Sequence, residues 1–345
     1  MMRIIFFTGI MLLFAACSTN KEFTIEGTTK TGFEGKVYLK EFVDLKWIPV
    51  DSTIIENQGF RFEGSVDIPD MYAVSFDGHK GSKRFCLENT DYLFEIGNNE
   101  SKSTVSGGSF QPGIEAFENE MSILKAEETK LRARYRKEMG DDALGNDIVK
   151  STWAEIETVL GKQAKLAQNY IHLNNASPYA PIVLDSYLRR QLEISKLDSL
   201  FNTIADDAKC TNYGKRVRVI IDNIIRSAVG QPFIDISAPG VDGKNITLSE
   251  VRKKHKVVFI EFWASWCGPC RAGIPKLKKT YKKYKPEGFE IYAVSYDTDK
   301  EKWIKAIEDE ELDWINVSNL KAWGCPTKAQ YAITGIPDNI LISPD

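Results

Sequence analysis

The 345-residue chain lacks several features that mark common classes of protein. Its 45 Lys and Arg stand against 48 Asp and Glu, so it has no excess of positive charge for binding nucleic acid. Six Cys are too few at this length for a disulfide scaffold, and each needs its own explanation. No apolar run reaches the roughly 20 residues that a membrane-spanning helix needs. What remains is an ordinary globular composition, long enough for two or three domains.

The first residues have the layout of a secretory signal. Arg3 supplies a positive charge, and the mostly apolar run 4–14 that follows is too short to span a bilayer. The run ends in two Ala followed by Cys17, a sequence that resembles a bacterial lipobox. This resemblance implies a signal peptide over 1–16 and a tether over 17–22, lipidated at Cys17. The alternative is a plain signal peptide followed by an unrelated Cys.

Residues 23–110 have the pattern of short β-strands. Apolar and polar residues alternate over segments such as 23–27 and 36–40, and Gly, Asn and Asp separate these segments. Short alternating strands of this kind favour an antiparallel β sandwich. We find no catalytic constellation here, because His79 is best explained as a loop residue and Cys86 as a small, half-buried apolar one.

Residues 111–229 change to helical spacing. Ile114 and Phe117 begin a series of apolar residues that predicts one apolar helix face, and this stripe indicates a packed core rather than a cofactor site. Cys210 has no companion in the sequence. A disulfide between Cys210 and Cys86 is an open alternative in an oxidising compartment.

Residues 230–345 alternate strand and helix patterns. The apolar runs 257–262 and 288–295 predict buried strands, and Thr298 with Glu301 has the capping-box pattern that opens a helix. Such alternation predicts a mostly parallel α/β sheet. We therefore expect a multidomain chain, with an N-terminal β sandwich, a helical middle region and a C-terminal α/β domain.

The chemistry is predicted at Cys267-Gly268-Pro269-Cys270, between a predicted strand and a helix. Two Cys separated by two residues can bridge the first turn of a helix, and Pro suits that turn because it presets φ and needs no donor. The helix N-terminus carries partial positive charge, which favours thiolate over thiol. We therefore expect Cys267 to attack a substrate disulfide and Cys270 to resolve the mixed disulfide.

A zinc site is the structural alternative for this Cys pair. Structural zinc normally has four N or S ligands, and the region offers only His255 and Cys325, with neither at ligand spacing. A redox dithiol is therefore favoured, with the Cys267–Cys270 disulfide in place of any cofactor or metal. Cys325 is interpreted as a spare Cys rather than a third redox thiol, because no pKa-lowering environment is evident.

Residues 261–275 resemble the active-site segment of the thioredoxin superfamily, specifically of its envelope TlpA/ResA-like branch. Besides the Cys pair, the segment carries Glu261, Trp266 and Pro275, the last matching a Pro that kinks the family's active-site helix. The resemblance covers roughly the last third of the chain. It implies a thioredoxin-like fold for that third.

The resemblance also implies roles for individual residues. Glu261 stands where thioredoxins carry a buried acid, which implies that it shuttles the proton of Cys270. Independently, a carboxylate on a buried strand has a raised pKa and can act as a base near neutrality. The alternative is a strand-end Glu that faces solvent. Trp266, Gly268 and Pro269 are expected to contact the substrate.

The segment 334–337 resembles the family's cis-Pro loop. The resemblance implies that Pro337 lies against the Cys pair after a cis peptide bond, a rare geometry, and that Ile336 offers its backbone groups to the substrate. The alternative is an ordinary trans Pro at the start of a strand. The family would continue with a turn, an edge strand and a helix, so we expect a domain truncated at Asp345.

As a whole, the resemblance implies a thiol–disulfide oxidoreductase anchored in the cell envelope by lipid, facing the periplasm or exposed at the surface. The implied substrates are disulfide-bearing envelope proteins such as apocytochrome c, and the implied electron donor is a membrane protein of the DsbD/CcdA type. The strand-rich region resembles a domain that precedes thioredoxin domains in many Gram-negative envelope lipoproteins. No nucleic-acid partner is expected.

Two alternatives to this function stay open. One is a peroxiredoxin-like peroxide reductase, although the Pro-x-x-x-Thr/Ser-x-x-Cys setting of a peroxidatic Cys is missing before Cys267. The other is a non-enzymatic, ligand-binding surface lipoprotein. The intact Cys pair, together with Glu261 and Pro337, argues against that second alternative.

Overall fold

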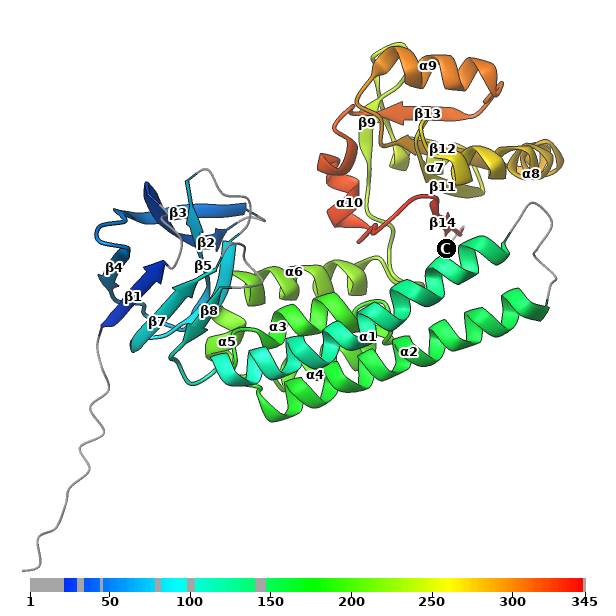
Figure 1. Ribbon diagram of the computed structural model, residues 1–345. Helices are drawn as coiled ribbons and strands as arrows, with labels where there is room; N and C mark the ends of the chain where they lie inside the picture. The colour runs from blue at the N-terminus through cyan, green and yellow to red at the C-terminus, as the bar shows by residue number, and fades with distance from the viewer. Residues whose placement is uncertain are drawn as a thin grey trace, which may run out of the picture. The chain divides into compact units, whose positions relative to one another are not determined.

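The computed structural model describes most of the chain as two compact units that divide between Val217 and Arg218 (Figure 1). The predicted signal peptide, the predicted lipidation site Cys17 and the loop residue His79 lie outside the described residues and stay predictions. The described residues are 22–29, 34–43, 46–77, 82–97, 103–139 and 147–343.

The strand-rich region forms two four-stranded sheets, ordered β4-β1-β7-β8 and β3-β2-β5-β6. Inward-facing side chains of both sheets, such as Ile25, Val37 and Phe94, belong to a shared hydrophobic core, as the alternating pattern predicts. The strands are β1 (Phe23–Thr29), β2 (Lys36–Val43), β3 (Lys46–Ile54), β4 (Gly59–Gly64), β5 (Asp70–Phe76), β6 (Ser82–Leu87), β7 (Asp91–Ile96) and β8 (Thr104–Ser106).

One strand pair departs from the antiparallel prediction. β1 pairs with β4 in antiparallel fashion but with β7 in parallel, from Thr24 opposite Asp91 to Thr29 opposite Ile96. A parallel pair needs a long crossover instead of a hairpin, and strands β2 to β6 provide that crossover here. The alternation of apolar residues reports the buried face of a strand but not its direction, so the sequence could not reveal this pairing.

The middle region is helical, and the first part of the apolar stripe predicted on its first helix is buried. Ile114 and Phe117 of α1 are buried, and the ring of Phe117 packs 4.8 Å from the ring of Tyr170 on α2. The stripe is therefore core packing. The segments are α1 (Gln111–Glu138), α2 (Asp147–Leu173), α3 (Ala180–Val183), the π-helical η2 (Leu184–Leu188), α4 (Ile194–Asn202), α5 (Asp206–Cys210) and α6 (Asn212–Arg226).

The alternative of a Cys86–Cys210 disulfide is wrong. Both thiols are free, and Cys86 lies fully buried in the sheet while Cys210 is exposed at the end of α5. Burial raises the pKa of the Cys86 thiol well above its ordinary value, so it behaves as an apolar core residue.

Across the described ranges, no helix is both long enough and apolar enough to cross a bilayer.

The C-terminal unit contains a four-stranded sheet ordered β13-β12-β11-β14, with β14 antiparallel to β11 and the other pairs parallel. The predicted strands 257–262 and 288–295 are β11 and β12 at the centre of this sheet, which confirms the α/β prediction. A two-stranded ribbon precedes the sheet. The strands are β9 (Ser237–Pro239), β10 (Asn245–Thr247), β11 (Val257–Trp263), β12 (Phe289–Ser295), β13 (Ile315–Ser318) and β14 (Asp338–Ile342).

The helices of this unit follow the predicted order, with one correction at a helix start. Helix α9 begins after Asp299, whose side chain accepts a hydrogen bond from the Lys302 N–H at 3.1 Å, so the cap is Asp299 and not Thr298. Either side chain can cap a helix, and the sequence pattern alone chose the wrong one. The helices are α7 (Leu248–Lys254), α8 (Gly268–Tyr284), the 3₁₀ turn η3 (Lys285–Glu287), α9 (Lys300–Asp309), the 3₁₀ turn η4 (Ala322–Gly324) and α10 (Pro326–Gln330).

Candidate functional site

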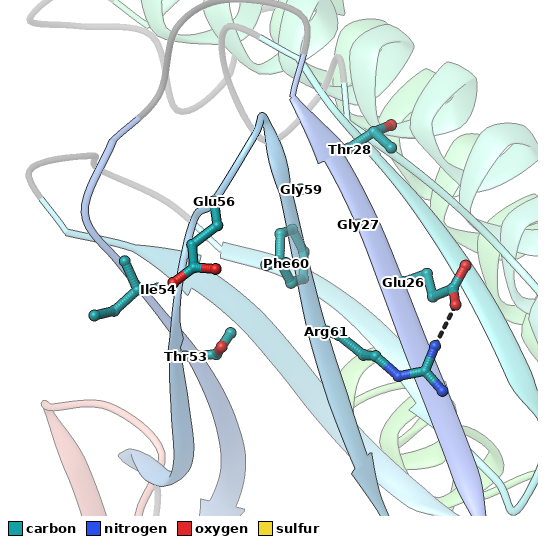
Figure 2. A pocket seen from close by; sticks show the side chains of 9 residues that line it. All are labelled: Glu26, Gly27, Thr28, Thr53, Ile54, Glu56, Gly59, Phe60 and Arg61. Atoms are coloured by element: carbon teal, nitrogen blue, oxygen red, sulfur yellow. Dashed lines mark hydrogen bonds and ion pairs between the residues drawn. The ribbon is translucent and has the colours of Figure 1, made fainter.

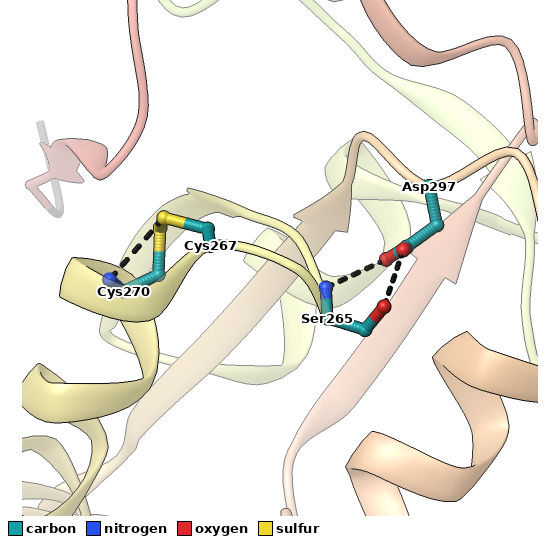
Figure 3. The surroundings of a disulfide bond; sticks show 4 residues. All are labelled: Ser265, Cys267, Cys270 and Asp297. Atoms are coloured by element: carbon teal, nitrogen blue, oxygen red, sulfur yellow. Dashed lines mark hydrogen bonds between the residues drawn. A yellow bond between two sulfur atoms is a disulfide. The ribbon is translucent and has the colours of Figure 1, made fainter.

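The two Cys of the predicted motif form a disulfide in the first turn of α8, at the end of central strand β11 (Figure 3). Their Cα atoms are 5.3 Å apart, and the sulfur atoms are bonded at 2.02 Å. Cys267 is the residue that caps α8, and its Sγ accepts a hydrogen bond from the Cys270 N–H at 3.2 Å. A thiolate on Cys267 would therefore meet a backbone donor and the positive end of the helix.

The disulfide belongs to the core of the C-terminal unit, yet it lies beside an exposed aromatic residue. Cys267 and Cys270 are each 4% exposed, whereas the neighbouring Trp266 is 56% exposed. Pro269 occupies the first turn of α8, and Pro275 lies inside the helix. Both Cys residues are thus largely covered by the rest of the unit.

Glu261 lies on β11, and its side chain lines a small pocket together with Cys270. Burial raises the pKa of the Glu261 carboxyl to about 7, and the Asp338 carboxylate adds to this effect. A carboxyl group with this pKa changes protonation close to neutral pH, as a general base must. Glu261 is therefore partly buried rather than fully exposed to solvent, and its role stays a prediction.

Asp297 is a residue beside the site that sequence reasoning missed. It is 1% exposed, and it accepts hydrogen bonds from the Ser265 N–H at 2.9 Å and the Ser265 hydroxyl at 2.6 Å (Figure 3). The Ser295 hydroxyl donates to the same carboxylate at 2.7 Å. This carboxylate ties the loop that carries Cys267 to the end of β12.

The hydrogen bonds from Ser265 and Ser295 to the Asp297 carboxylate form a clamp on the loop before Cys267, for which the sequence carries only a weak signal. Ser265 and Asp297 each follow a predicted buried strand, and the carboxyl ends of adjacent parallel strands meet at one edge of a sheet. Polar residues at two such ends are candidates for a shared hydrogen-bond cluster. Nothing in the sequence shows, however, which of them will pair.

The peptide bond between Ile336 and Pro337 is cis, as the resemblance to the cis-Pro loop implies. Directly after it begins β14, where Asp338 stands opposite Phe262 of β11. The loop therefore enters the sheet next to the strand that carries Glu261. The roles of Ile336 and Pro337 toward a substrate stay predictions.

The remaining candidates for redox or metal chemistry have partners other than the disulfide. Cys325 is buried and free, with its Sγ 3.0 Å from the Thr327 hydroxyl oxygen. His255 lies 3.8 Å from the Glu290 carboxylate. Within the part of the chain that the structure describes, no three His, Cys, Asp or Glu side chains gather into a group that could hold a metal ion.

A second pocket lies in the strand-rich region, on strands β1, β3 and β4 (Figure 2). Arg61 and Glu26 form an ion pair across it, and it contains neither Cys nor His. This pocket cannot carry thiol chemistry. Its lining residues are Glu26, Gly27, Thr28, Thr53, Ile54, Glu56, Gly59, Phe60 and Arg61.

Comparison with known proteins agrees with this site. Residues 229–343 match the AhpC/TSA family, and residues 23–111 match a domain of unknown function, DUF4369. The thiol-disulfide oxidoreductase ResA of Bacillus thuringiensis (strain Al Hakam) is 36% identical over 69 residues, which are 20% of this chain and 39% of that protein. ResA of Bacillus subtilis (strain 168) is 42% identical over 59 residues, which are 17% of this chain and 32% of that protein.

Among solved structures, the thioredoxin domain of a thiol-disulfide oxidoreductase from Bacteroides vulgatus is 36% identical. The match covers 34% of this chain and 82% of that chain, with a TM-score of 0.32. The chain spans 39% or less of the length of the two ResA proteins.

The four-stranded sheet, the Cys pair that opens α8 and the matched family define a thioredoxin-superfamily domain. Within that superfamily, the C-terminal domain of this chain is TlpA/ResA-like.

Proposed function

We propose that the chain is an envelope-anchored thiol–disulfide oxidoreductase that reduces protein disulfides through Cys267 and Cys270. The observation that carries the proposal is the pairing of these Cys at the start of α8, with Glu261 and Cys270 lining one pocket. The names of the ResA relatives support the reaction class.

The reaction starts from the reduced pair. The Cys267 thiolate attacks one sulfur of a substrate disulfide, forms a mixed disulfide and releases the other substrate sulfur as a thiolate, which takes up a proton. The Cys270 N–H and the N-terminus of α8 stabilise the attacking thiolate before it reacts. Trp266, Gly268, Pro269 and the Ile336 backbone are the proposed contacts for the substrate chain.

The second step returns the pair to its disulfide. Cys270 loses its proton to the Glu261 carboxylate and attacks the Cys267 sulfur, which breaks the mixed disulfide and releases the reduced substrate. Two electrons thus pass from the Cys pair to the substrate disulfide. The disulfide in the structure is the product of this half-cycle, and a new cycle needs an outside reductant.

The proposal includes the location and the partners of the protein. We place the lipid anchor on Cys17 after removal of the signal peptide 1–16, with the thioredoxin-like domain held in the periplasm or at the surface. Disulfide-bearing envelope proteins, apocytochrome c among them, are the proposed substrates, and a membrane protein of the DsbD/CcdA type is the proposed electron donor. We also propose that residues 23–110 form an antiparallel β sandwich except at the β1–β7 pair, followed by a helical region to 229.

Reduction of insulin disulfides by dithiothreitol tests the activity. We expect the full chain to accelerate it, and the Cys267→Ala and Cys270→Ala variants to lose that acceleration. The Cys210→Ala variant is the matched control, because it removes an exposed free thiol that belongs to the other unit. Equal activity in all three variants would contradict the proposal.

The direction of the reaction is a separate measurement. Equilibration of the Cys267–Cys270 pair with glutathione should give a potential near that of thioredoxin, about −270 mV. A potential as high as that of DsbA, about −120 mV, would identify an oxidant and overturn the reductase assignment.

A further inference from the structure

A cavity of ≈ 200 Å³ lies within the N-terminal unit, between strands and helices. Its lining residues come from β2, β3, β5 and β6 of one sheet, from α1, α3, η2 and α6, and from the residue before α3. An apolar cavity of about 150 Å³ holds one benzene ring, so this space suits a ligand of about the size of one large amino acid.

Much of the lining is apolar and aromatic. Met71 is 5% exposed and Ile114 is 3% exposed. Three aromatic side chains pack together beside them, with the ring centroids of Phe42 and Trp47 5.1 Å apart and those of Phe42 and Tyr213 5.7 Å apart. Such a wall favours a ligand with a large apolar group.

A buried carboxylate without a counter-ion lines the same cavity. Asp70 is 9% exposed, and it accepts hydrogen bonds from the Met71 N–H at 2.7 Å and the Asn212 N–H at 3.1 Å. No cation of the described chain forms an ion pair with it, and Lys215 acts on it only from beyond ion-pair distance. Burial raises the pKa of the Asp70 carboxyl, so a cationic group in the cavity would stabilise its charged form.

An unpaired guanidinium lines the cavity as well. Arg84 of β6 is exposed, and it makes no hydrogen bond or ion pair with any residue that the structure describes. In the antiparallel pair, Met71 stands opposite Cys86 and Ala73 opposite Arg84, so Arg84 points to the same face of the sheet as Met71. A guanidinium presents two parallel N–H donors that match a carboxylate.

The other carboxylate of the lining already has a donor. Glu118 of α1 is exposed, and it accepts a hydrogen bond from the Tyr179 hydroxyl at 2.8 Å. The groups of the cavity that lack an ionic partner are therefore the buried anion Asp70 and the exposed cation Arg84. A ligand with one positive and one negative group beside an apolar body is complementary to them.

We propose that this cavity binds one free α-amino acid with a large apolar side chain. The ammonium group of the amino acid pairs with Asp70, and its carboxylate forms the two parallel hydrogen bonds with Arg84. Its side chain packs against Phe42, Trp47 and Met71. The site uses no residue of the C-terminal unit, so it is separate from the reaction proposed for the Cys pair.

The first test measures binding of L-leucine, L-methionine and L-phenylalanine to the full oxidised chain by isothermal titration calorimetry. We expect at least one of them to bind with one molecule per chain. Two analogues of that amino acid each remove one charge: the amide lacks the carboxylate, and the N-acetyl derivative lacks the ammonium group. Each should bind about tenfold or more weakly, because each loses a charge-assisted contact.

The second test repeats the titration with variants of the two charged residues. Asp70→Asn and Arg84→Gln should each weaken binding of the unmodified amino acid by about tenfold or more. Lys83→Gln is the matched control, because it removes the same charge from the adjacent residue of β6, which does not line the cavity. This control variant should bind as the wild type does.

Absence of binding by all three amino acids would overturn the inference. Equal affinity for the amide would also overturn it, because the amide resembles the N-terminal residue of a peptide, and equal affinity for the N-acetyl derivative would do so because that resembles the C-terminal residue. Equal losses in Arg84→Gln and Lys83→Gln would do the same. Should Asp70→Asn fail to fold, the analogues tested on wild type still decide the question. A chain that binds the amino acid but does not reduce insulin would refute the proposed function alone.

Discussion

At the scale of single residues, Glu261 links the chemistry of the site to the stability of the fold. Burial raises the pKa of its carboxyl from 4.5 to about 7, so the folded chain favours the neutral acid. The stabilising contribution of this group is full below about pH 4.5 and is lost as the pH rises through about 7. The base that we propose at Glu261 is therefore obtained at the expense of stability at high pH.

Replacing Glu261 by Gln should remove this pH dependence. A difference of about 2.5 pKa units corresponds to about 3 kcal/mol at 1.36 kcal/mol per unit, so Glu261→Gln should gain up to about that much unfolding free energy at pH 8 and little at pH 4. Urea unfolding of the oxidised protein at the two pH values measures it. The exposed Glu301→Gln variant controls for the charge, and an equal gain there would contradict the account.

Residues whose roles depend on local sequence could be predicted, and residues that act through a partner from another element could not. The Cys pair follows from its spacing at a helix start, and Glu261 from its place on a buried strand six residues earlier. Asp297 follows β12 and contacts the loop before Cys267, whereas Trp314 precedes β13 and lines the pocket beside Cys270. Their relevance depends on which side chains meet across the sheet. Spacing along the sequence does not show these contacts.

At the scale of elements, the loop between β11 and α8 is held by the end of β12. Three donors satisfy the buried Asp297 carboxylate, two from Ser265 and one from Ser295. The Asp297 backbone oxygen also accepts a hydrogen bond from the Ala322 N–H at 3.4 Å, which connects η4 to the same point. One buried carboxylate thus fixes the segment that leads into Cys267.

Truncation of Asp297 should destabilise the C-terminal unit strongly. Asp297→Ala leaves the Ser265 and Ser295 donors buried without an acceptor, so the free energy of unfolding should fall by about 3 kcal/mol. Asp299→Ala, two residues later, removes an exposed helix cap and should cost clearly less. Chemical denaturation compares the two, and similar losses would show that Asp297 does not hold the loop.

Elements were predictable where one segment decides its own structure. The apolar runs of β11 and β12 and the stripe on α1 appear as expected, because each reports its own buried face. The parallel pairing of β1 with β7 and the choice of Asp299 over Thr298 as the α9 cap did not follow from sequence. The strand pairing and the helix cap both depend on contacts with neighbouring residues, which the pattern within one segment does not specify.

At the scale of the whole molecule, the residues that we propose for the redox reaction lie in the C-terminal unit. The disulfide, the carboxyl group of Glu261 and the clamp at Asp297 all belong to residues after Arg218. The strand-rich region contributes a pocket with no thiol or imidazole. From the sequence, the Cys-pair motif predicts the reaction in the last third of the chain. The upstream regions predict only where the protein is located and no chemistry of their own.

The central claim is that Cys267 is the nucleophile that attacks protein disulfides and Cys270 resolves the product. Mass spectrometry of reduced Cys270→Ala protein after incubation with insulin tests it most directly, because the variant cannot complete the second step. We expect one mixed disulfide per chain, mapped to Cys267, released by dithiothreitol and absent when Cys267 is also Ala. No adduct, or an adduct mapped to Cys210 instead, would contradict the claim.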